Sequence, residues 1–211
     1  MFKVQVRATL LALFLPLLLN ATTILKNDIL NPEAAKLIEQ MGNELISKTG
    51  INGYVVATNE NFPERYNLVE YSRTYEANIS KPFVMLIFAP NALVTVKSGQ
   101  KGRVALIPSS QDLVELYDKS DVMDATIDVI AAKDKNSKED KYNIGVVQGF
   151  SELADQIADA KDIELTTTLP NETRVIIGVL QVIVIAGALL VFWMFIFRPL
   201  YMRIRYGKQE Q

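Results

Sequence analysis

The sequence predicts an α/β fold: a small mixed sheet covered by helices on both faces, followed by one C-terminal transmembrane helix. Three observations predict it. Apolar residues at helical spacing alternate with strand-like runs between residues 31 and 160. The run 83–89, FVMLIFA, is apolar throughout, which is typical of a strand buried on both faces. The run from Val175 to Phe197 contains one polar residue, Gln181, and is long enough to cross the core of a bilayer.

The first predicted helix begins at Asn31-Pro32, because asparagine is a favoured N-cap and proline is favoured at the first helical position. Apolar residues recur at helical spacing as far as Leu45, and Gly50 supplies a C-cap. The run 54–56 is then rich in the residues that favour a strand. We therefore expect a helix followed directly by a strand.

The middle of the chain predicts a second helix beginning at Pro63 and then three strands. The strand 83–89 is expected to turn at Pro90-Asn91 and to return as an antiparallel partner over 93–97. The glycines of SGQKG make a second turn before a fourth strand over 103–107. This turn could also cradle a phosphate through its backbone N–H groups, although a plain hairpin turn is the commoner outcome.

Helical spacing returns from Ser110 to Ala132, with a break expected near Ser120. Charges of both signs alternate over 133–141, which predicts a solvated loop. A last helix follows, whose buried face holds Val146, Phe150, Leu153 and Ile157. Residues 162–173 are polar and contain a proline, so we expect a stalk there.

The two ends of the chain predict export and anchoring. Residues 1–21 have the basic start, short apolar run and small final residue of a signal peptide. A transmembrane helix is expected over 174–198, followed by a basic tail over 199–211. Because arginines and a lysine gather on that tail, the tail is expected in the cytoplasm and the preceding domain on the other side of the membrane.

Composition restricts the chemistry that the chain can perform. The sequence contains no histidine and no cysteine, so the usual general base, thiolate nucleophiles and thiolate metal sites are excluded. The 22 basic and 24 acidic residues nearly balance, which gives no support to nucleic-acid binding. Any catalysis would use carboxylates, hydroxyls or lysine.

Two local patterns predict ligand or modification sites. Six acidic residues follow one another at steps of three or four: Asp112, Glu115, Asp118, Asp121, Asp124 and Asp128. Of these, Asp118, Asp121 and Asp124 are the candidate metal ligands, because calcium prefers carboxylate oxygens. The alternative is the solvent face of an amphipathic helix. The sequence EANIS also makes Asn78 a candidate glycosylation site.

Several motifs together resemble the TPM-domain family. ELISKTGINGYVVAT is similar to its opening helix and strand, PFVMLIFAPNALVTVKSGQKG to its central hairpin, and KYNIGVVQGFSELADQIA to its closing helix. The resemblance implies a three-layer α-β-α sandwich over residues 29–161, preceded by a signal peptide and followed by a membrane helix. It also implies an acidic residue before the first helix, for which this sequence offers Asp28, with Glu64 as a second carboxylate. Arg103 stands where that family usually has an acidic residue.

Topology and resemblance predict a binding or assembly module, anchored in the inner membrane with its domain in the periplasm of a bacterial envelope. Its predicted partners are other envelope membrane or periplasmic proteins, with homo-oligomerisation left open. The alternative is a carboxylate- and metal-dependent phosphatase of the TPM type, for which calcium would be the cofactor. Convergence of the acidic residues on one place would favour the phosphatase.

Overall fold

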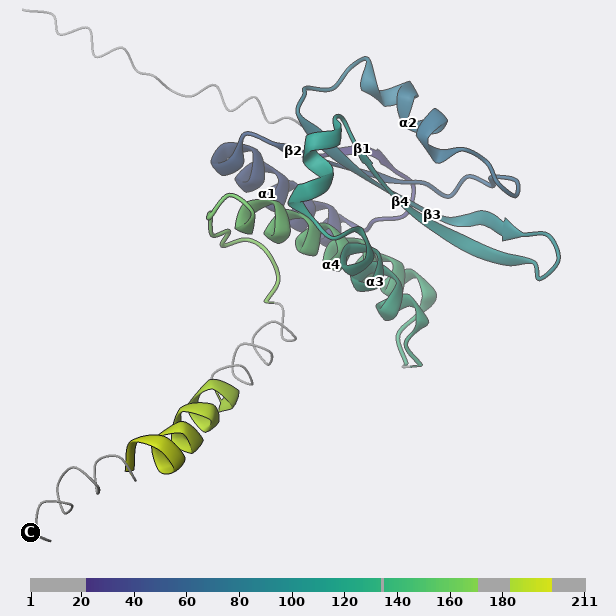
Figure 1. Ribbon diagram of the computed structural model, residues 1–211. Helices are drawn as coiled ribbons and strands as arrows, with labels where there is room; N and C mark the ends of the chain where they lie inside the picture. Colours follow the sequence, from purple (N-terminus) through teal and green to yellow (C-terminus); the bar gives the residue numbers. More distant parts are fainter. Residues whose placement is uncertain (1–21, 134, 171–182, 199–211) are drawn as a thin grey trace, which may run out of the picture. The chain divides into compact units, whose positions relative to one another are not determined.

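The computed structural model of this protein describes residues 22–133, 135–170 and 183–198. The chain divides into two compact units, which meet between Leu169 and Pro170. The first unit holds a four-stranded sheet and its helices (Figure 1). The predicted signal peptide, 1–21, and the basic tail, 199–211, lie outside the described residues.

The sheet is mixed, as predicted, and its strands lie in the order β1-β2-β3-β4. β1 (Ile24–Asn27) and β3 (Phe83–Thr95) both pair in parallel with β2 (Asn52–Ala57). β4 (Gln100–Pro108) pairs with β3 in the antiparallel sense. β1 and β2 therefore end at the same edge of the sheet, where the loops after them begin, whereas β3 continues beyond it.

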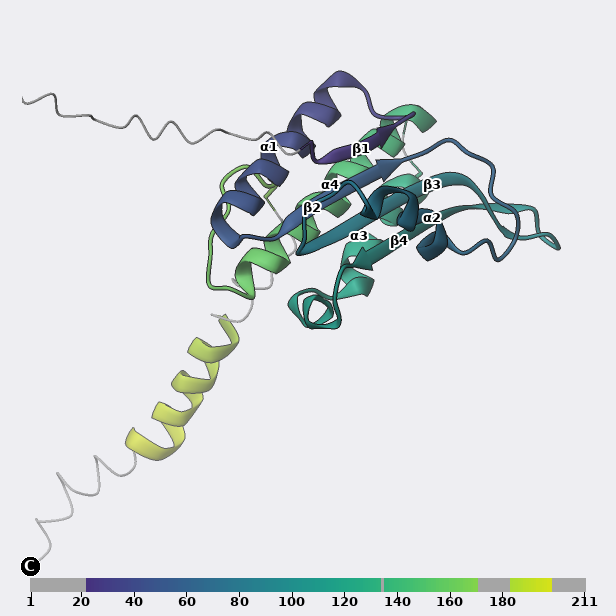
Figure 2. The ribbon, with the colours of Figure 1, turned by 90° about the horizontal axis from the view of Figure 1, so that it is seen from above.

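One face of the sheet is covered by three helices: α1 (Pro32–Thr49), α3 (Lys119–Ala131) and α4 (Lys138–Asp159) (Figures 1 and 2). The ends of α1 form as the sequence predicts. The side chain of Asn31 accepts a hydrogen bond from the backbone N–H of Ala34, and Gly50 ends the helix at a φ of 75°. The predicted buried face of α4 is confirmed from Val146 to Ile157.

The opposite face is covered by α2 (Leu68–Glu76) and by the loop before it. Alternate residues of β3 enter the two cores: Val84, Leu86 and Phe88 face α1 and α4, whereas Met85 and Ile87 face α2. This explains the unbroken apolar run 83–89, and the prediction of a strand buried on both faces is confirmed.

Three expectations about the strands and α2 are wrong. β3 continues through Pro90 to Thr95, because its pairing with β4 has a bulge between Ala89 and Leu93 that tolerates a residue without an N–H. The hairpin turn comes later, at 96–99, where Gly99 has a φ of 64°. β1 was not expected at all, and α2 begins at Leu68 rather than at Pro63.

The predicted break in the helical region 110–132 is confirmed. A 3-10 helix, η1 (Gln111–Leu116), is followed by α3, whose first turn is capped by the side chain of Asp118. α3 buries Val122 and Thr126 against α4, whereas Ile127 is 41% exposed. Two glycines of α4 permit this contact, because a Cβ at Gly149 would lie 1.9 Å from Thr126 Oγ1, and one at Gly145 would lie 2.6 Å from the Thr126 carbonyl.

The first unit is longer than the predicted 29–161. Residues 163–169, which we call the C-terminal strap, lie against α1 and α4 instead of forming free stalk. Leu165 is buried, and Leu169 donates its backbone N–H to Ser151 Oγ at 2.7 Å. The carboxylate of Glu44 accepts hydrogen bonds from the backbone and hydroxyl groups of Thr166 and Thr167.

The described part of the second unit is helical over 183–198, with a π-helical turn, η2 (Trp193–Phe197), near its end. Its large apolar side chains are exposed, from Ile183 at 61% to Phe197 at 51%. Within the described segments, no helix is both long and apolar enough to span a membrane. The predicted span 174–198 begins among residues 171–182, which lie outside the described residues.

Candidate functional site

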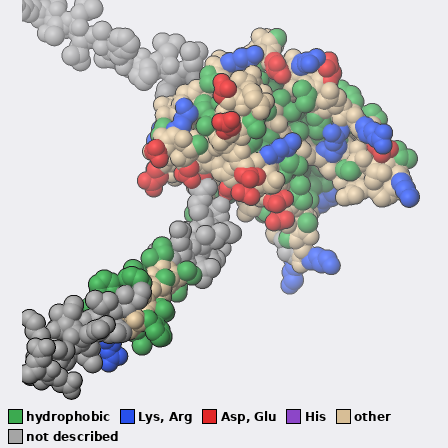
Figure 3. Space-filling model, viewed as in Figure 1, with side chains coloured by type: hydrophobic (Ala, Val, Ile, Leu, Met, Phe, Trp, Pro, Cys, Tyr) green, Lys and Arg blue, Asp and Glu red, His purple; other side chains and the backbone are tan. Residues whose placement is uncertain are grey.

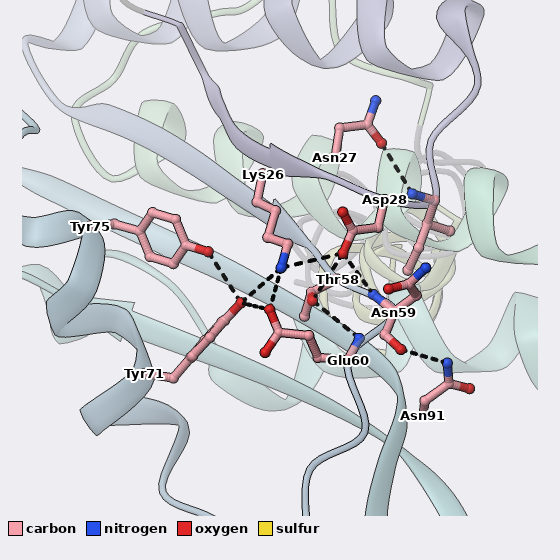
Figure 4. A network of polar contacts seen from close by, with 10 residues as sticks. Lys26, Asn27, Asp28, Thr58, Asn59, Glu60, Tyr71, Tyr75 and Asn91 are labelled. Carbon is pink, nitrogen blue, oxygen red and sulfur yellow. Dashed lines mark hydrogen bonds and ion pairs between the residues drawn. The ribbon is translucent and has the colours of Figure 1, made fainter.

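The candidate site lies at the edge of the sheet where the parallel strands β1 and β2 end (Figure 4). The loop after β1 leads to α1 on one face, and the loop after β2 leads to α2 on the other face. In open α/β sheets, ligands bind outside the carboxyl ends of strands where neighbouring connections separate in this way. The side chains at this edge are therefore the candidate functional residues.

Lys26, in β1, is the centre of this network. Its ammonium group contacts Asp28 Oδ2 at 3.4 Å and forms an ion pair with Glu60, which follows β2. It also donates a hydrogen bond to Tyr71 Oη at 3.5 Å (Figure 4). One cation thus joins two carboxylates that lie far apart in the sequence and come from different loops.

Asp28 is held by the loop that follows β2. Its Oδ2 accepts hydrogen bonds from Thr58 Oγ1 at 3.3 Å and from the backbone N–H of Asn59 at 3.2 Å. Asn91, in β3, donates its side-chain N–H to the Asn59 carbonyl at 2.8 Å. These contacts tie the ends of β1 and β2 to the middle of β3, which fixes the position of the Asp28 carboxylate.

Two tyrosines of α2 complete the network. The hydroxyl of Tyr71 donates to Glu60 Oε1 at 3.0 Å, and the hydroxyl of Tyr75 donates to Tyr71 Oη at 3.1 Å. Their rings pack edge to face with centroids 5.7 Å apart, because residues four positions apart lie on the same face of a helix. The two side chains therefore have a double role, with rings in the core and hydroxyls in the polar network.

The electrostatics of the network favour fixed protonation states. The hydrogen bond to Glu60 raises the pKa of Lys26 above its ordinary value, although burial acts in the opposite direction. The same bond lowers the pKa of Glu60, again against burial. Burial, and then the hydrogen bond to Tyr71, raise the pKa of Tyr75. Near neutral pH, Lys26 is an ammonium ion and Tyr75 a phenol, so neither serves as a base or nucleophile there.

We expect Lys26→Met to lower the free energy of unfolding by about 1 kcal/mol, because it removes the cation that two partly exposed carboxylates share. The measurement is urea unfolding at pH 7. Lys36→Met is the matched control, since Lys36 is exposed on α1. Equal effects of the two substitutions would contradict a specific role for Lys26.

The structure does not assemble the predicted metal ligands. Asp118 accepts hydrogen bonds from the backbone N–H groups of Ser120 and Asp121 as the N-cap of α3, and Asp121 and Asp124 are exposed along that helix. In the described part of the chain, no three acidic side chains lie close enough to hold a metal ion. Steps of three residues move around a helix, so the carboxylates point in different directions.

The other candidates from the sequence occupy defined places. Asn78 is exposed in the turn after α2, and its glycosylation stays a prediction. Glu64 accepts a hydrogen bond from the backbone N–H of Val96, which joins the loop before α2 to the β3–β4 hairpin. Arg103 donates to the Tyr66 carbonyl at 2.6 Å, so the glycine turn is followed by a structural arginine.

The sequence indicated only Asp28 of this network, through the TPM resemblance. Lys26 was missed because β1 is four residues long and follows the predicted signal peptide directly. One local signal could have indicated a strand that ends in polar residues. It is the pattern Ile-Leu-Lys-Asn-Asp, in which two apolar residues are followed by polar and charged ones. Glu60 carries no such signal, because its role depends on a contact across 34 positions.

No protein-family model matches this sequence, and no curated protein matches it significantly. The resemblance to the TPM-domain family therefore stays a prediction.

Proposed function

We propose that this protein is a TPM-like module that binds or assembles envelope proteins, carried on the periplasmic side of the inner membrane by its C-terminal helix. In this proposal the first unit makes the contacts with partners. The signal peptide exports it, and the apolar C-terminal segment holds it at the membrane.

One observation favours a binding role over a catalytic one: Lys26 pairs with both Asp28 and Glu60 at the edge of the sheet where β1 and β2 end. A carboxylate that acts in catalysis or binds a metal must offer free lone pairs to its substrate or ion. Here one oxygen of each carboxylate is already engaged: Asp28 Oδ2 by the ammonium group and the loop after β2, and Glu60 Oε1 by the ammonium group and Tyr71. The edge is therefore suited to fixing the shape of the surrounding loops.

The anchoring part of the proposal is supported by the chemistry of residues 183–198. This segment is a helix whose apolar side chains are exposed, and Arg198 is its first charged residue. Exposed apolar surface of that extent requires a cover, which a bilayer or a partner helix provides. The arginines and lysine beyond it favour a cytoplasmic C-terminus under the positive-inside rule.

The test combines two measurements on the purified full chain. Titration calorimetry with Ca²⁺ and Mg²⁺, and an assay with a generic phosphomonoester, are both expected to give no response. In mild detergent extracts of its native membrane, the tagged chain is expected to migrate in a complex larger than the chain itself, together with defined envelope proteins.

Carboxylate-dependent turnover would contradict the proposal and favour the phosphatase. The informative variant is Asp28→Asn, which alters the carboxylate that the loop after β2 holds at the end of β1. Asp112→Asn is the matched control, because Asp112 is exposed in η1. Hydrolysis that Asp28→Asn abolishes and Asp112→Asn leaves intact would establish an enzyme.

A further inference from the structure

The hairpin of β3 and β4 projects beyond the helices of the first unit (Figures 1 and 2). β2 pairs with β3 only as far as Phe88, so the last part of the hairpin extends past the sheet. Its end, which we call the hairpin tip, carries two valines and two lysines. They are Val94, Val96, Lys97 and Lys101, all exposed. At 67%, Val96 is the most exposed large apolar side chain among described residues 22–170.

The other end of β4 has the opposite charge. η1 begins three residues after β4, and together with the first turn of α3 it forms a surface that we call the acidic end. Its exposed residues include Asp112, Val114, Glu115, Asp121 and Asp118, the cap of α3. Lys119, also exposed, is the one cation of the segment 110–132. Val114 is 39% exposed, so this surface also has an apolar centre among its charges.

Both surfaces carry charges that no other residue described by the structure neutralises in an ion pair. Within residues 22–133 and 135–170, neither Lys97 nor Lys101 forms an ion pair, and the same holds for Asp112, Glu115 and Asp121. β4 separates the two surfaces by about 30 Å, at about 3.4 Å for each of its nine residues. Because the strand is fixed in the sheet, one molecule cannot bring its own tip to its own acidic end. In Figure 3 the projecting end carries basic side chains, whereas acidic ones gather mainly elsewhere on the same face.

We propose that the hairpin tip of one molecule docks on the acidic end of a second copy of this chain. Val96 then packs against Val114 of the neighbour, while Lys97 and Lys101 face Asp112 and Glu115. The two surfaces are different, so the contact is heterologous: each copy keeps a free tip or a free acidic end, and further copies add to form a ring or a filament. This inference rests on the assembly function proposed above and names its first partner.

The test is sedimentation velocity of the purified full chain in mild detergent, over a range of concentrations. At low salt the mass is expected to rise with concentration, and 1 M salt should weaken this association because exposed charges are then screened beyond about 3 Å. Lys97→Glu with Lys101→Glu should weaken it roughly tenfold or more, since the tip then repels the acidic end. Lys133→Glu with Lys135→Glu is the matched control, because it makes the same change of charge at exposed lysines elsewhere.

A charge swap distinguishes docking on the acidic end from a general effect of charge. Asp112→Lys with Glu115→Lys should weaken association in the same way, and a mixture of the two double variants should restore it, because each supplies the surface that the other lacks. A monomer at every concentration would overturn the inference, as would association that Lys97→Glu with Lys101→Glu leaves unchanged. So would a tip that binds vesicles of anionic lipid but no second copy. If the chain is monomeric but captures envelope proteins, the proposed function is supported and the docking of two copies is refuted.

Discussion

Glu44→Ala is expected to free the C-terminal strap, residues 163–169, and to lower the free energy of unfolding of the first unit by about 3 kcal/mol at neutral pH. The Glu44 side chain is 11% exposed. It accepts hydrogen bonds from the N–H and hydroxyl groups of Thr166 and Thr167, at distances from 2.6 to 3.0 Å. Lys48 pairs with it at 2.8 Å and also donates to the Glu164 carbonyl.

The dependence of this contribution on pH follows from the pKa of Glu44. Burial alone would raise that pKa, but the bonds from Lys48, Thr167 and Thr166 outweigh burial and lower it from 4.5 to about 2. The folded state therefore binds the proton more weakly than the unfolded chain does. The stabilisation is fully present above pH 4.5 and is lost as the pH falls toward 2. The difference in stability between the wild type and Glu44→Gln should shrink over the same range.

Two measurements check the strap. Urea unfolding from pH 7 down to pH 3 follows the free energy, and hydrogen exchange follows the backbone N–H groups of Thr166 and Thr167. Glu33→Gln, at an exposed position in the first turn of α1, is the control. The role assigned to Glu44 is wrong if Glu44→Ala leaves the exchange of those two N–H groups as slow as in the wild type.

Gly149→Ala is expected to lower the free energy of unfolding by about 2 to 3 kcal/mol, although alanine is normally the better residue within a helix. The added Cβ would lie 1.9 Å from Thr126 Oγ1, closer than any real contact. Thr126 is fully buried and donates its hydroxyl to the Val122 carbonyl at 3.0 Å. α3 must therefore move away from α4, which opens the core between them.

Thr126→Ala tests this explanation directly, because it removes the oxygen that the new methyl group would strike. The double variant Gly149→Ala with Thr126→Ala is expected to recover most of the lost stability, to within about 1 kcal/mol of Thr126→Ala alone. Thermal and urea unfolding of the four proteins complete the cycle. A single Gly149→Ala variant as stable as the wild type would mean that the helices are not in close contact at this point.

Several elements could be predicted from the sequence because their signals are local. The Asn31 and Gly50 caps of α1 depend on residues within one turn of the helix. The burial of 83–89 follows from composition, since a strand covered on both faces has no polar side. The break before α3 is likewise marked by a capping residue, Asp118. In each case the residues that cause the feature are neighbours in the chain.

Other elements could not be read in this way, because contacts between distant residues decide them. Pro90 normally indicates a turn, yet β3 passes through it because β4 allows a bulge at that place. β1 is too short to be recognised, and it is a strand because β2 offers it a parallel partner. The polar network could not be predicted from the sequence for the same reason. Lys26, Glu60 and Tyr71 meet only when the loop after β2 folds back over the end of β1.

The sequence by itself determined the α/β class, the caps and buried faces of α1 and α4, and the exclusion of histidine and cysteine chemistry. These depend on local spacing and on composition. The tertiary structure alone decided that Lys26 joins Asp28 to Glu60, that the acidic series does not converge, and that Glu44 holds the C-terminal strap. The physical reason is that hydrogen bonds and ion pairs need atoms within about 3 to 4 Å, and only the folded sheet brings such distant residues that close.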